Sequence, residues 1–238
     1  MLPYIQEHHT REGNVREFWE QIKENIGVLI GAFGLKPRLS VEEYDRLEAL
    51  YNADDCQGCV ALIGNRFPLH KTRFKVVIHG PWKIRDRLRF TWVDDVFDFF
   101  WEKAEKARTS KHKRPIWPGM YHLDKEKNDG ESIVVQMEMH FWAKRLPFEV
   151  FVALVAREVA LMWLQEACSQ KAELRMLNNP VYAEILAMIA GFDHAVWNGQ
   201  YFGRYQFSAL DLPDLRVIHE YLKEKRREAG IVSEWERS

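Results

Sequence analysis

The sequence has few cysteines and no long hydrophobic run. Three cysteines in 238 residues, an odd number, argue against a framework of disulfide bonds. No apolar stretch approaches the roughly 20 residues that a membrane-spanning helix needs. The first residues, MLPYIQEHHTREG, lack the basic start and apolar block of a secretory signal. These absences predict a cytoplasmic protein that has no membrane partner.

Motifs of common catalytic sites are also missing. The chain contains no phosphate-binding P-loop, no G-x-G-x-x-G and no G-x-S-x-G. Arg157 and Leu161 stand where an H-E-x-x-H zinc site would have its two histidines, and only Glu158 fits that motif. We therefore expect Arg157 and Glu158 to make buried polar contacts. We also expect that the protein binds a partner rather than catalysing a reaction.

The composition is that of a globular protein with a large core. Hydrophobic residues make up 47% of the chain and charged residues 29%, and the aromatic residues include 9 Trp and 14 Phe. Such a chain can bury enough apolar surface to fold without disulfide bonds or a structural metal ion. We predict a single domain over residues 1–238, with a helical part (1–57), a sheet-rich part (58–145) and a second helical part (146–238).

The helical part at the start of the chain is predicted from periodicity and capping. Apolar residues at helical spacing predict a helix from Val15 to about Phe33. Ser40 with Glu43 three residues later is a capping box that opens a second helix. The following NADDCQGC predicts a loop, and the apolar run Val60–Gly64 predicts a short buried strand.

The sheet-rich part is predicted to contain a hairpin and two further strands. Residues 71–90 form the hairpin, with HGPW as its turn. Residues 92–107 have the pattern of an amphipathic helix, and residues 120–123 and 132–142 that of strands.

Three helices are predicted in the last part of the chain. They begin at Pro147, at Asn179 with Pro180, and at Asp211 with Pro213. The first two are apolar nearly all round, which is typical of helices in the middle of a protein. We expect these two to pack on each other and on the sheet, with His194 as a core histidine. The predicted fold class is α+β, a largely antiparallel sheet covered by helices.

Positive charge is concentrated in the middle of the chain. The net charge is only -1, but residues 71–114 contain 13 Lys and Arg against 6 Asp and Glu. The segments on either side carry 7 against 11 and 14 against 18. A basic middle between two acidic flanks predicts an anionic partner for residues 71–114.

The cations of the predicted hairpin alternate with apolar residues. Lys71, Arg73 and Lys75 fall on one face of the first strand, and four more cations fall on one face of the second. Because like charges on one hairpin face repel, the pattern favours an anion such as a phosphate backbone. The predicted nucleic-acid contacts, with Trp82 as a stacking residue, are Lys71, Arg73, Lys75, Trp82, Lys83, Arg85, Arg87, Arg89, Lys111, Lys113 and Arg114.

Two alternatives to nucleic-acid binding also fit this pattern of cations. Carboxylates of the acidic flanks could neutralise the cations, which would make them an ordinary solvated sheet face. The face could also bind an acidic protein, so that the chain would be a non-catalytic adaptor. Nucleic acid is the preferred partner, with the chain as one subunit of a larger assembly that has other protein subunits.

A metal-dependent nuclease or other hydrolase is the enzymatic alternative. Asp86 falls on the apolar face of the predicted hairpin, where a carboxylate needs a partner. Glu138 and His140 lie on the polar face of the strand 132–142. If these three residues meet, they could hold a catalytic metal ion beside a phosphate.

No cofactor is predicted. The alternative is a bound zinc ion. Cys56 and Cys59 form a C-x-x-C, which is a redox motif when it begins a helix and a metal motif when other ligands join it. We expect the pair in a loop before a strand, which does not suit redox chemistry. His70 and His79 would complete a zinc site, although with a spacing that is not a standard one.

Overall fold

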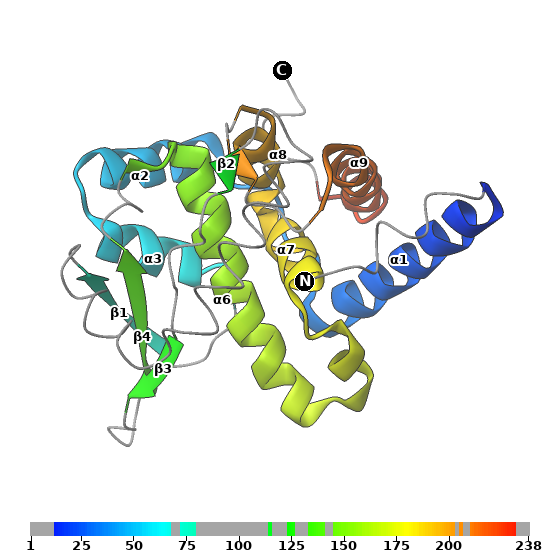
Figure 1. Cartoon of the computed structure of the whole chain (residues 1–238), viewed down its shortest axis with the longest axis horizontal. Coiled ribbons are helices and arrows are strands. Elements are labelled where there is room, and N and C mark those ends of the chain that lie inside the picture. The colour runs from blue at the N-terminus through cyan, green and yellow to red at the C-terminus, as the bar shows by residue number, and fades with distance from the viewer. Residues whose placement is uncertain are drawn as a thin grey trace.

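In the computed structural model, helices make up most of the residues that the structure describes (Figure 1). The structure describes residues 12–67, 72–79, 114–115, 123–126, 133–140, 145–202, 205–206 and 210–231. Strands β1, β3 and β4 lie on one side of the central helix α6, and helices α7, α9 and α1 lie on the other side.

Most of the described strands fall between two helical stretches of the chain. The helical elements are α1 (Glu12–Phe33), α2 (Val41–Asn52), α3 (Cys56–Gly64), α6 (Phe148–Gln170), η3 (Ala172–Leu177), α7 (Pro180–Ala187), η4 (Met188–Phe192), α8 (Asp193–Phe202) and α9 (Leu212–Glu228). The strands are β1 (Thr72–His79), β2 (Arg114–Pro115), β3 (Leu123–Glu126), β4 (Ile133–His140) and β5 (Tyr205–Gln206).

The predicted fold class is wrong. A largely antiparallel sheet under helices is not what the structure has, because helices dominate the described residues and the described strands are few. Among the described strands, the longest pairing, between β1 and β4, is parallel, and β3 with β4 is the one antiparallel pair. The sequence prediction overestimated the sheet because it assigned the helical residues Val60–Gly64 to a strand and paired residues 71–79 with the residues that follow them.

Helix α6 is the centre of the hydrophobic core. Its residues from Val150 to Ala156 are all buried, as expected for a helix that is apolar nearly all round. It packs against α7 and α8, so the prediction that the two apolar segments pack on each other is confirmed. Within the part of the chain that the structure describes, no helix, α6 included, is both long and apolar enough to cross a membrane.

The two helices that follow α1 have side-chain caps at their N-termini. Ser40 Oγ accepts a hydrogen bond from the Glu43 backbone N–H at 3.1 Å, and the Glu43 carboxylate accepts one from the Ser40 N–H at 2.9 Å. This confirms the predicted capping box. Asp55 caps α3 by accepting a hydrogen bond from the Gly58 N–H at 2.8 Å. The predicted strand Val60–Gly64 is therefore the end of a capped helix, and the proposed boundary at residue 57 falls inside α3.

The predicted basic hairpin is also wrong. Its first arm is strand β1, but β1 pairs in parallel with β4, from Thr72 opposite Ile133 to His79 opposite His140. The Gln57 side-chain amide donates to the Phe74 carbonyl at 2.6 Å, and its oxygen accepts from the Val76 N–H at 2.8 Å. Because Gln57 already occupies these backbone groups, a returning strand cannot pair with them. The second arm, residues 83–90, lies outside the described residues.

A break between α7 and α8 interrupts the second apolar helix. The segment η4 is a π-helical turn, a feature that is often found at functional sites, and Gly191 inside it has a φ of +102°. A Cβ atom at Gly191 would lie 2.3 Å from the Pro37 carbonyl oxygen. The chain between α1 and α2 crosses at this point, with the Lys36 N–H donating to the Ile189 carbonyl at 3.0 Å and the Leu39 N–H donating to the Gly191 carbonyl at 3.3 Å.

Gly191→Ala tests whether this close approach holds the segment in place. Gly34 is the matched control, because its φ is also positive (+76°) but a Cβ there would meet nothing within 4 Å. Both substitutions strain the backbone. We expect Gly191→Ala to lower the free energy of unfolding in urea by about 1–3 kcal/mol more than Gly34→Ala does, because it also displaces the Pro37 backbone. Equal effects of the two substitutions would contradict the close approach.

Candidate functional site

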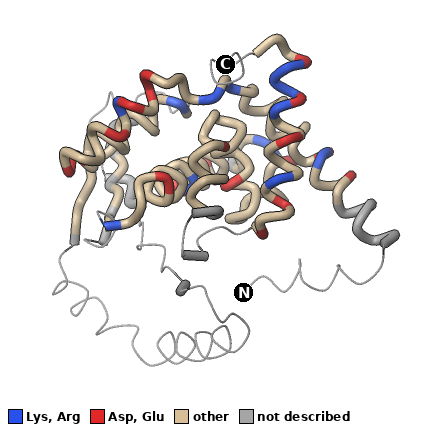
Figure 2. Tube along the Cα trace, turned by 90° about the horizontal axis from the view of Figure 1, so that it is seen from above, with Lys and Arg blue, Asp and Glu red and all other residues tan. Residues whose placement is uncertain are grey.

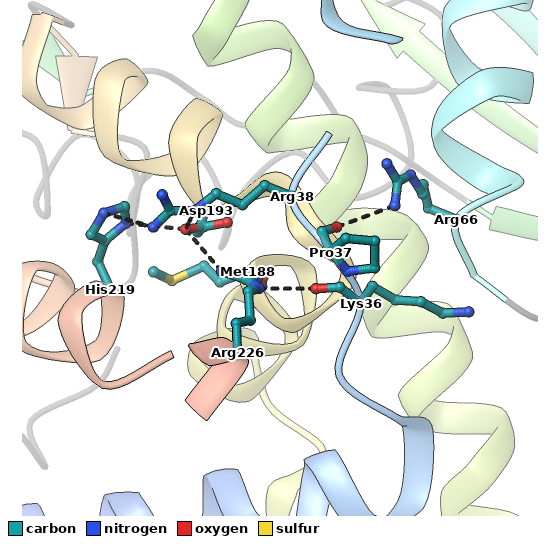
Figure 3. A network of polar contacts seen from close by, with 8 residues as sticks. All are labelled: Lys36, Pro37, Arg38, Arg66, Met188, Asp193, His219 and Arg226. Atoms are coloured by element: carbon teal, nitrogen blue, oxygen red, sulfur yellow. Dashed lines mark hydrogen bonds and ion pairs between the residues drawn. The ribbon is translucent and has the colours of Figure 1, made fainter. Parts of the chain in front are cut away.

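A buried carboxylate, Asp193, lies at the start of α8 beside the helix break. Its side chain is fully buried, and its Oδ2 atom lies 2.8 Å from Arg38 Nε and 3.2 Å from Arg226 Nη1. His219 Nδ1 is 3.2 Å from the same oxygen. Figure 3 shows these three side chains converging on Asp193 from the α1–α2 connection and from α9. We call Asp193, Arg38, His219 and Arg226 the Asp193 cluster.

The hydrogen bonds of the cluster determine the tautomer of His219 when it is neutral. Arg38 Nη2 lies 3.1 Å from His219 Nε2. A guanidinium can only donate, so Nε2 must be the accepting, unprotonated nitrogen. The proton is then on Nδ1, which faces the Asp193 carboxylate. Because Nε2 lies against Arg38 and Nδ1 against the Asp193 carboxylate, His219 is a structural member of the cluster.

Arg226 joins the cluster to two backbone segments. Its Nε donates to the Lys36 carbonyl at 2.9 Å and its Nη2 donates to the Met188 carbonyl at 2.7 Å. Its side chain is 1% exposed, so this guanidinium is removed from water almost completely. Three of its nitrogens therefore face three different parts of the chain, the α1–α2 connection, η4 and α8. An arginine suits this position because its planar fork of donors can reach several acceptors at once.

A second arginine, Arg66, supports the same connection from the other side. Arg66 Nη1 donates to the Pro37 carbonyl at 3.2 Å, and Arg66 Nη2 forms an ion pair with Glu43 Oε2. Figure 3 shows Arg66 and the Asp193 cluster on opposite sides of the Lys36–Arg38 segment. The connection between α1 and α2 is thus held at consecutive residues by side chains from α8, from α9 and from the end of α3.

The electrostatics of the cluster favour an ionised Asp193. Burial alone would raise the pKa of the Asp193 carboxyl, but the contact with His219 and the positive charges of Arg226 and Arg38 outweigh it, and the pKa lies well below its ordinary value. Asp193 also occupies the first turn of α8, where the helix dipole favours a negative charge. Such a cluster can fix chain segments in place, and it provides neither a nucleophile nor a base that faces solvent.

His194 is not the core histidine that the sequence predicted. Its neighbour Asp193 is buried, while His194 is exposed, with its ring against Tyr44 at a centroid distance of 5.7 Å. His194 Nε2 lies 2.9 Å from Asn198 Nδ2. Partial desolvation of the imidazole lowers its pKa, and the nearby Arg38 acts in the same direction. The buried member of this pair of neighbours is therefore Asp193, and the prediction that His194 lies in the core is wrong.

Arg157 and Glu158 do form the buried polar contact expected of them. Arg157 Nη2 lies 3.1 Å from Glu158 Oε1, and the two side chains are 10% and 15% exposed. Desolvation raises the pKa of Glu158, while Arg157 opposes that change. The two charged residues in the middle of α6 are thus paired with each other.

Few of the predicted nucleic-acid contacts lie within the described residues. Arg73 and Lys75 lie on β1, and Arg114 lies in β2, which pairs with β5. Lys75 is exposed between Phe74 and Val76, which are partly buried, so the predicted alternation holds at these three positions. The remaining predicted contacts fall outside the described residues; they are Lys71, Trp82, Lys83, Arg85, Arg87, Arg89, Lys111 and Lys113.

The face of the sheet that carries Lys75 also carries acidic residues. In the registers of the two pairings, Lys75 is opposite Gln136, and Gln136 is opposite Asp124 of β3. Register partners share one face of a sheet. Arg73 and Glu126 likewise flank Val134. In the backbone register, acidic positions of β3 thus lie in the same rows as the cation positions of β1.

The two cysteines of the C-x-x-C begin a helix, contrary to the predicted loop. Cys56 is the first residue of α3 and Cys59 the fourth, and both are buried. A helix N-terminus usually lowers a thiol pKa. In α3, burial, with Cys56 and Asp55 nearby, raises the pKa of Cys59 to about 12. The pair therefore has the position in a helix that a redox motif has, while burial keeps the Cys59 thiol protonated at neutral pH.

The predicted metal and catalytic candidates are only partly brought together. Asp86 and His70 lie outside the described residues. Glu138 and His140 fall on β4, and His140 is the register partner of His79. Among the side chains that the structure describes, no group of three or more His, Cys, Asp and Glu residues could hold a metal ion. For His79, Glu138 and His140, the structure gives their positions in the backbone register of β1 and β4.

The Asp193 cluster was missed by sequence reasoning. Its members come from the α1–α2 connection, α8 and α9, and no local spacing connects them. The one signal was Asp193 itself, a carboxylate in an otherwise apolar helix, which must be paired if it is buried. That signal indicates a partner but does not identify it, because arginines occur throughout the chain.

Asp193→Asn tests the ionic character of the cluster. At about pH 7 we expect it to lower the free energy of unfolding by about 3–5 kcal/mol, because it leaves the buried Arg226 and the partly buried Arg38 without their counter-charge. The Asp193 pKa is depressed in the folded state. Its stabilisation is therefore complete above the unfolded pKa of about 3.9 and is lost as the pH falls below that value.

Urea unfolding at about pH 7 and at about pH 3 measures this difference. Asp45→Asn is the control, because it makes the same chemical change at an exposed position on α2 and should stay within about 0.5 kcal/mol of the wild type. If Asp193→Asn costs no more than Asp45→Asn at about pH 7, the cluster is not held by charge.

Comparison with known proteins gives no relative for this arrangement. No protein-family model matches the chain, and neither a curated protein nor a solved structure matches it. The support for a function therefore comes from the charges and the geometry of the chain's own residues.

Proposed function

We propose that this protein binds the phosphate backbone of a nucleic acid through residues 71–114, the basic segment. The observation that carries the proposal is the distribution of charge. The basic segment has 13 Lys and Arg against 6 Asp and Glu, while acidic residues exceed basic ones on both sides of it. A local excess of seven positive charges in a chain of net charge -1 creates a field that attracts a polyanion.

The described start of the basic segment supports this proposal. Phe74 of β1 packs on α3, where its ring lies so close that a Cβ on Gly64 would be 2.4 Å away. The next residue, Lys75, is exposed. The core thus anchors the strand by its apolar residues, and at least one cation of the segment lies at the surface beside them.

Elsewhere, basic residues lie among acidic ones. Figure 2 shows Lys and Arg interspersed with Asp and Glu along the described helices. On α9, Lys225 Nζ is 2.8 Å from Glu228 and Arg227 Nη2 is 3.9 Å from Glu224, and on α1 Lys23 Nζ is 2.9 Å from Glu20. The two charges of each pair cancel when seen from a distance. The basic segment therefore dominates the attraction of an anion.

The proposed mechanism is charge neutralisation with little recognition of base sequence. Lysine and arginine contacts to phosphates release bound counterions, so the affinity falls steeply as salt rises. Phosphate contacts of this kind position a protein without specifying bases. Trp82 could add stacking on a base, which is tolerant of sequence in the same way.

Arg85→Glu with Arg87→Glu tests the basic segment directly. We expect the double variant to weaken binding to a short single-stranded or duplex oligonucleotide at least tenfold at about 50 mM salt. The slope of log affinity against log salt should become shallower by about 2, since two phosphate contacts are lost. A filter-binding titration in chelator, over a range of salt concentrations, measures both quantities.

The matched control is Arg216→Glu with Arg227→Glu on α9, which changes the net charge equally at two exposed positions. It should leave affinity and salt slope close to those of the wild type. Equal losses in the two double variants would mean that overall charge, not the basic segment, drives binding. A wild type that binds no nucleic acid contradicts the proposal, and binding of an acidic protein that persists after nuclease treatment would favour the adaptor function.

A further inference from the structure

Two histidines occupy the last paired positions of the parallel strands β1 and β4. His79 ends β1, His140 ends β4, and the two residues are register partners. They are far apart in the sequence, so only the parallel pairing brings them together. The carboxyl ends of adjacent parallel strands meet at one edge of a sheet, which is where α/β proteins often bind ligands.

Alternation along β4 places a carboxylate on the same face as this pair. Val135, Met137 and Met139 are buried, so they define the core face of β4. Successive residues of a strand face opposite ways. Glu138 and His140 therefore belong to the other face, together with His79, the register partner of His140.

The backbone spacing of the three residues is compatible with a shared metal ion. Register partners on neighbouring strands lie about 4.8 Å apart, and residues two apart along a strand lie about 6.6–6.8 Å apart. Two imidazoles and a carboxylate are a donor set that binds Zn²⁺ with three protein ligands and leaves a position for water. Imidazole nitrogens also favour zinc and similar transition metals over Mg²⁺ and Ca²⁺, which prefer oxygen.

The geometry points to a transition-metal site formed by His79, His140 and Glu138 at the carboxyl end of the β1–β4 pair, with Zn²⁺ as the metal that best fits these donors. Two histidines side by side on a sheet repel each other when both are protonated. A shared divalent cation converts that repulsion into ligation. Asp124, which is opposite Gln136 on β3, adds a further negative charge to the same face.

The histidine site differs from the zinc site considered from the sequence. That earlier candidate required Cys56 and Cys59, which are buried at the start of α3. The histidine site shares only His79 with it and has no thiolate ligand. It is also independent of nucleic-acid binding, because a metal can bind to these residues in the absence of any polyanion.

Isothermal titration of the full chain with Zn²⁺, after removal of metals by a chelator and without nucleic acid, tests the site. We expect about one Zn²⁺ per chain at this site, with binding weakened at least tenfold in His79→Gln and in His140→Gln, and to a smaller extent in Glu138→Gln. His8→Gln with His9→Gln is the matched control, since it removes two neighbouring histidines elsewhere in the sequence. That control variant should bind Zn²⁺ like the wild type.

A second measurement needs no variant and so does not depend on correct folding of the substituted chains. X-ray absorption of the zinc-loaded wild type should show imidazole and oxygen ligands only. Thiolate ligation would assign the metal to the cysteines and overturn the inference. Absence of Zn²⁺ binding, or binding that is lost with His8 and His9 but not with His79 and His140, would overturn it as well. None of these results bears on the filter-binding titration, which is made in chelator.

Discussion

One buried carboxylate, that of Asp193, connects the segments on which the helical core depends. A fully buried negative charge is costly unless it is paired, and Arg38, Arg226 and His219 pair it. These partners belong to the α1–α2 connection and to α9, so pairing the charge also fixes these segments against α8. The helix break at Gly191 is what allows the α1–α2 backbone to come close enough, because a side chain there would collide with Pro37. The polar cluster and the break are thus parts of one arrangement.

The elements that local physics determines could be predicted from the sequence. The helix after Ser40 follows from a capping box, and α6 follows from a long apolar segment behind Pro147. The helical Val60–Gly64 could not be assigned from its apolar run, because a short buried strand and a short buried helix look alike in sequence. Asp55, which caps α3, was the residue that distinguished them.

Contacts between distant residues account for the predictions that failed. The hairpin was expected because residues 71–79 are followed closely by a turn sequence, but β1 pairs with β4, which lies much further along the chain. The side chain of Gln57 also forms hydrogen bonds with the backbone of β1 at Phe74 and Val76, and its place in a C-x-x-C gave no indication of that role. The Asp193 cluster likewise joins residues as far apart in the sequence as Arg38 and Arg226, and the sequence shows only that Asp193 needs a partner.

The two ends of the molecule therefore differ in what they can do. Around Asp193, charges are buried, paired and engaged, which suits a structural role. On the β1–β4 side, Lys75 is at the surface and two histidines end adjacent strands, which suits the binding of ions or charged ligands. The basic segment begins on this second side, so the proposed partners are expected there rather than at the cluster.

The most direct test of the role of Asp193 is a double-mutant cycle between Asp193 and Arg226, made with Asp193→Asn and Arg226→Met. Because the contacts of Arg226 with Lys36 and Met188 are lost in both backgrounds, the cycle isolates the coupling between the two charges. Urea unfolding at about pH 7 should give a favourable coupling energy of about 1–3 kcal/mol. A coupling near zero would contradict the claim that the buried carboxylate holds α8 and α9 together.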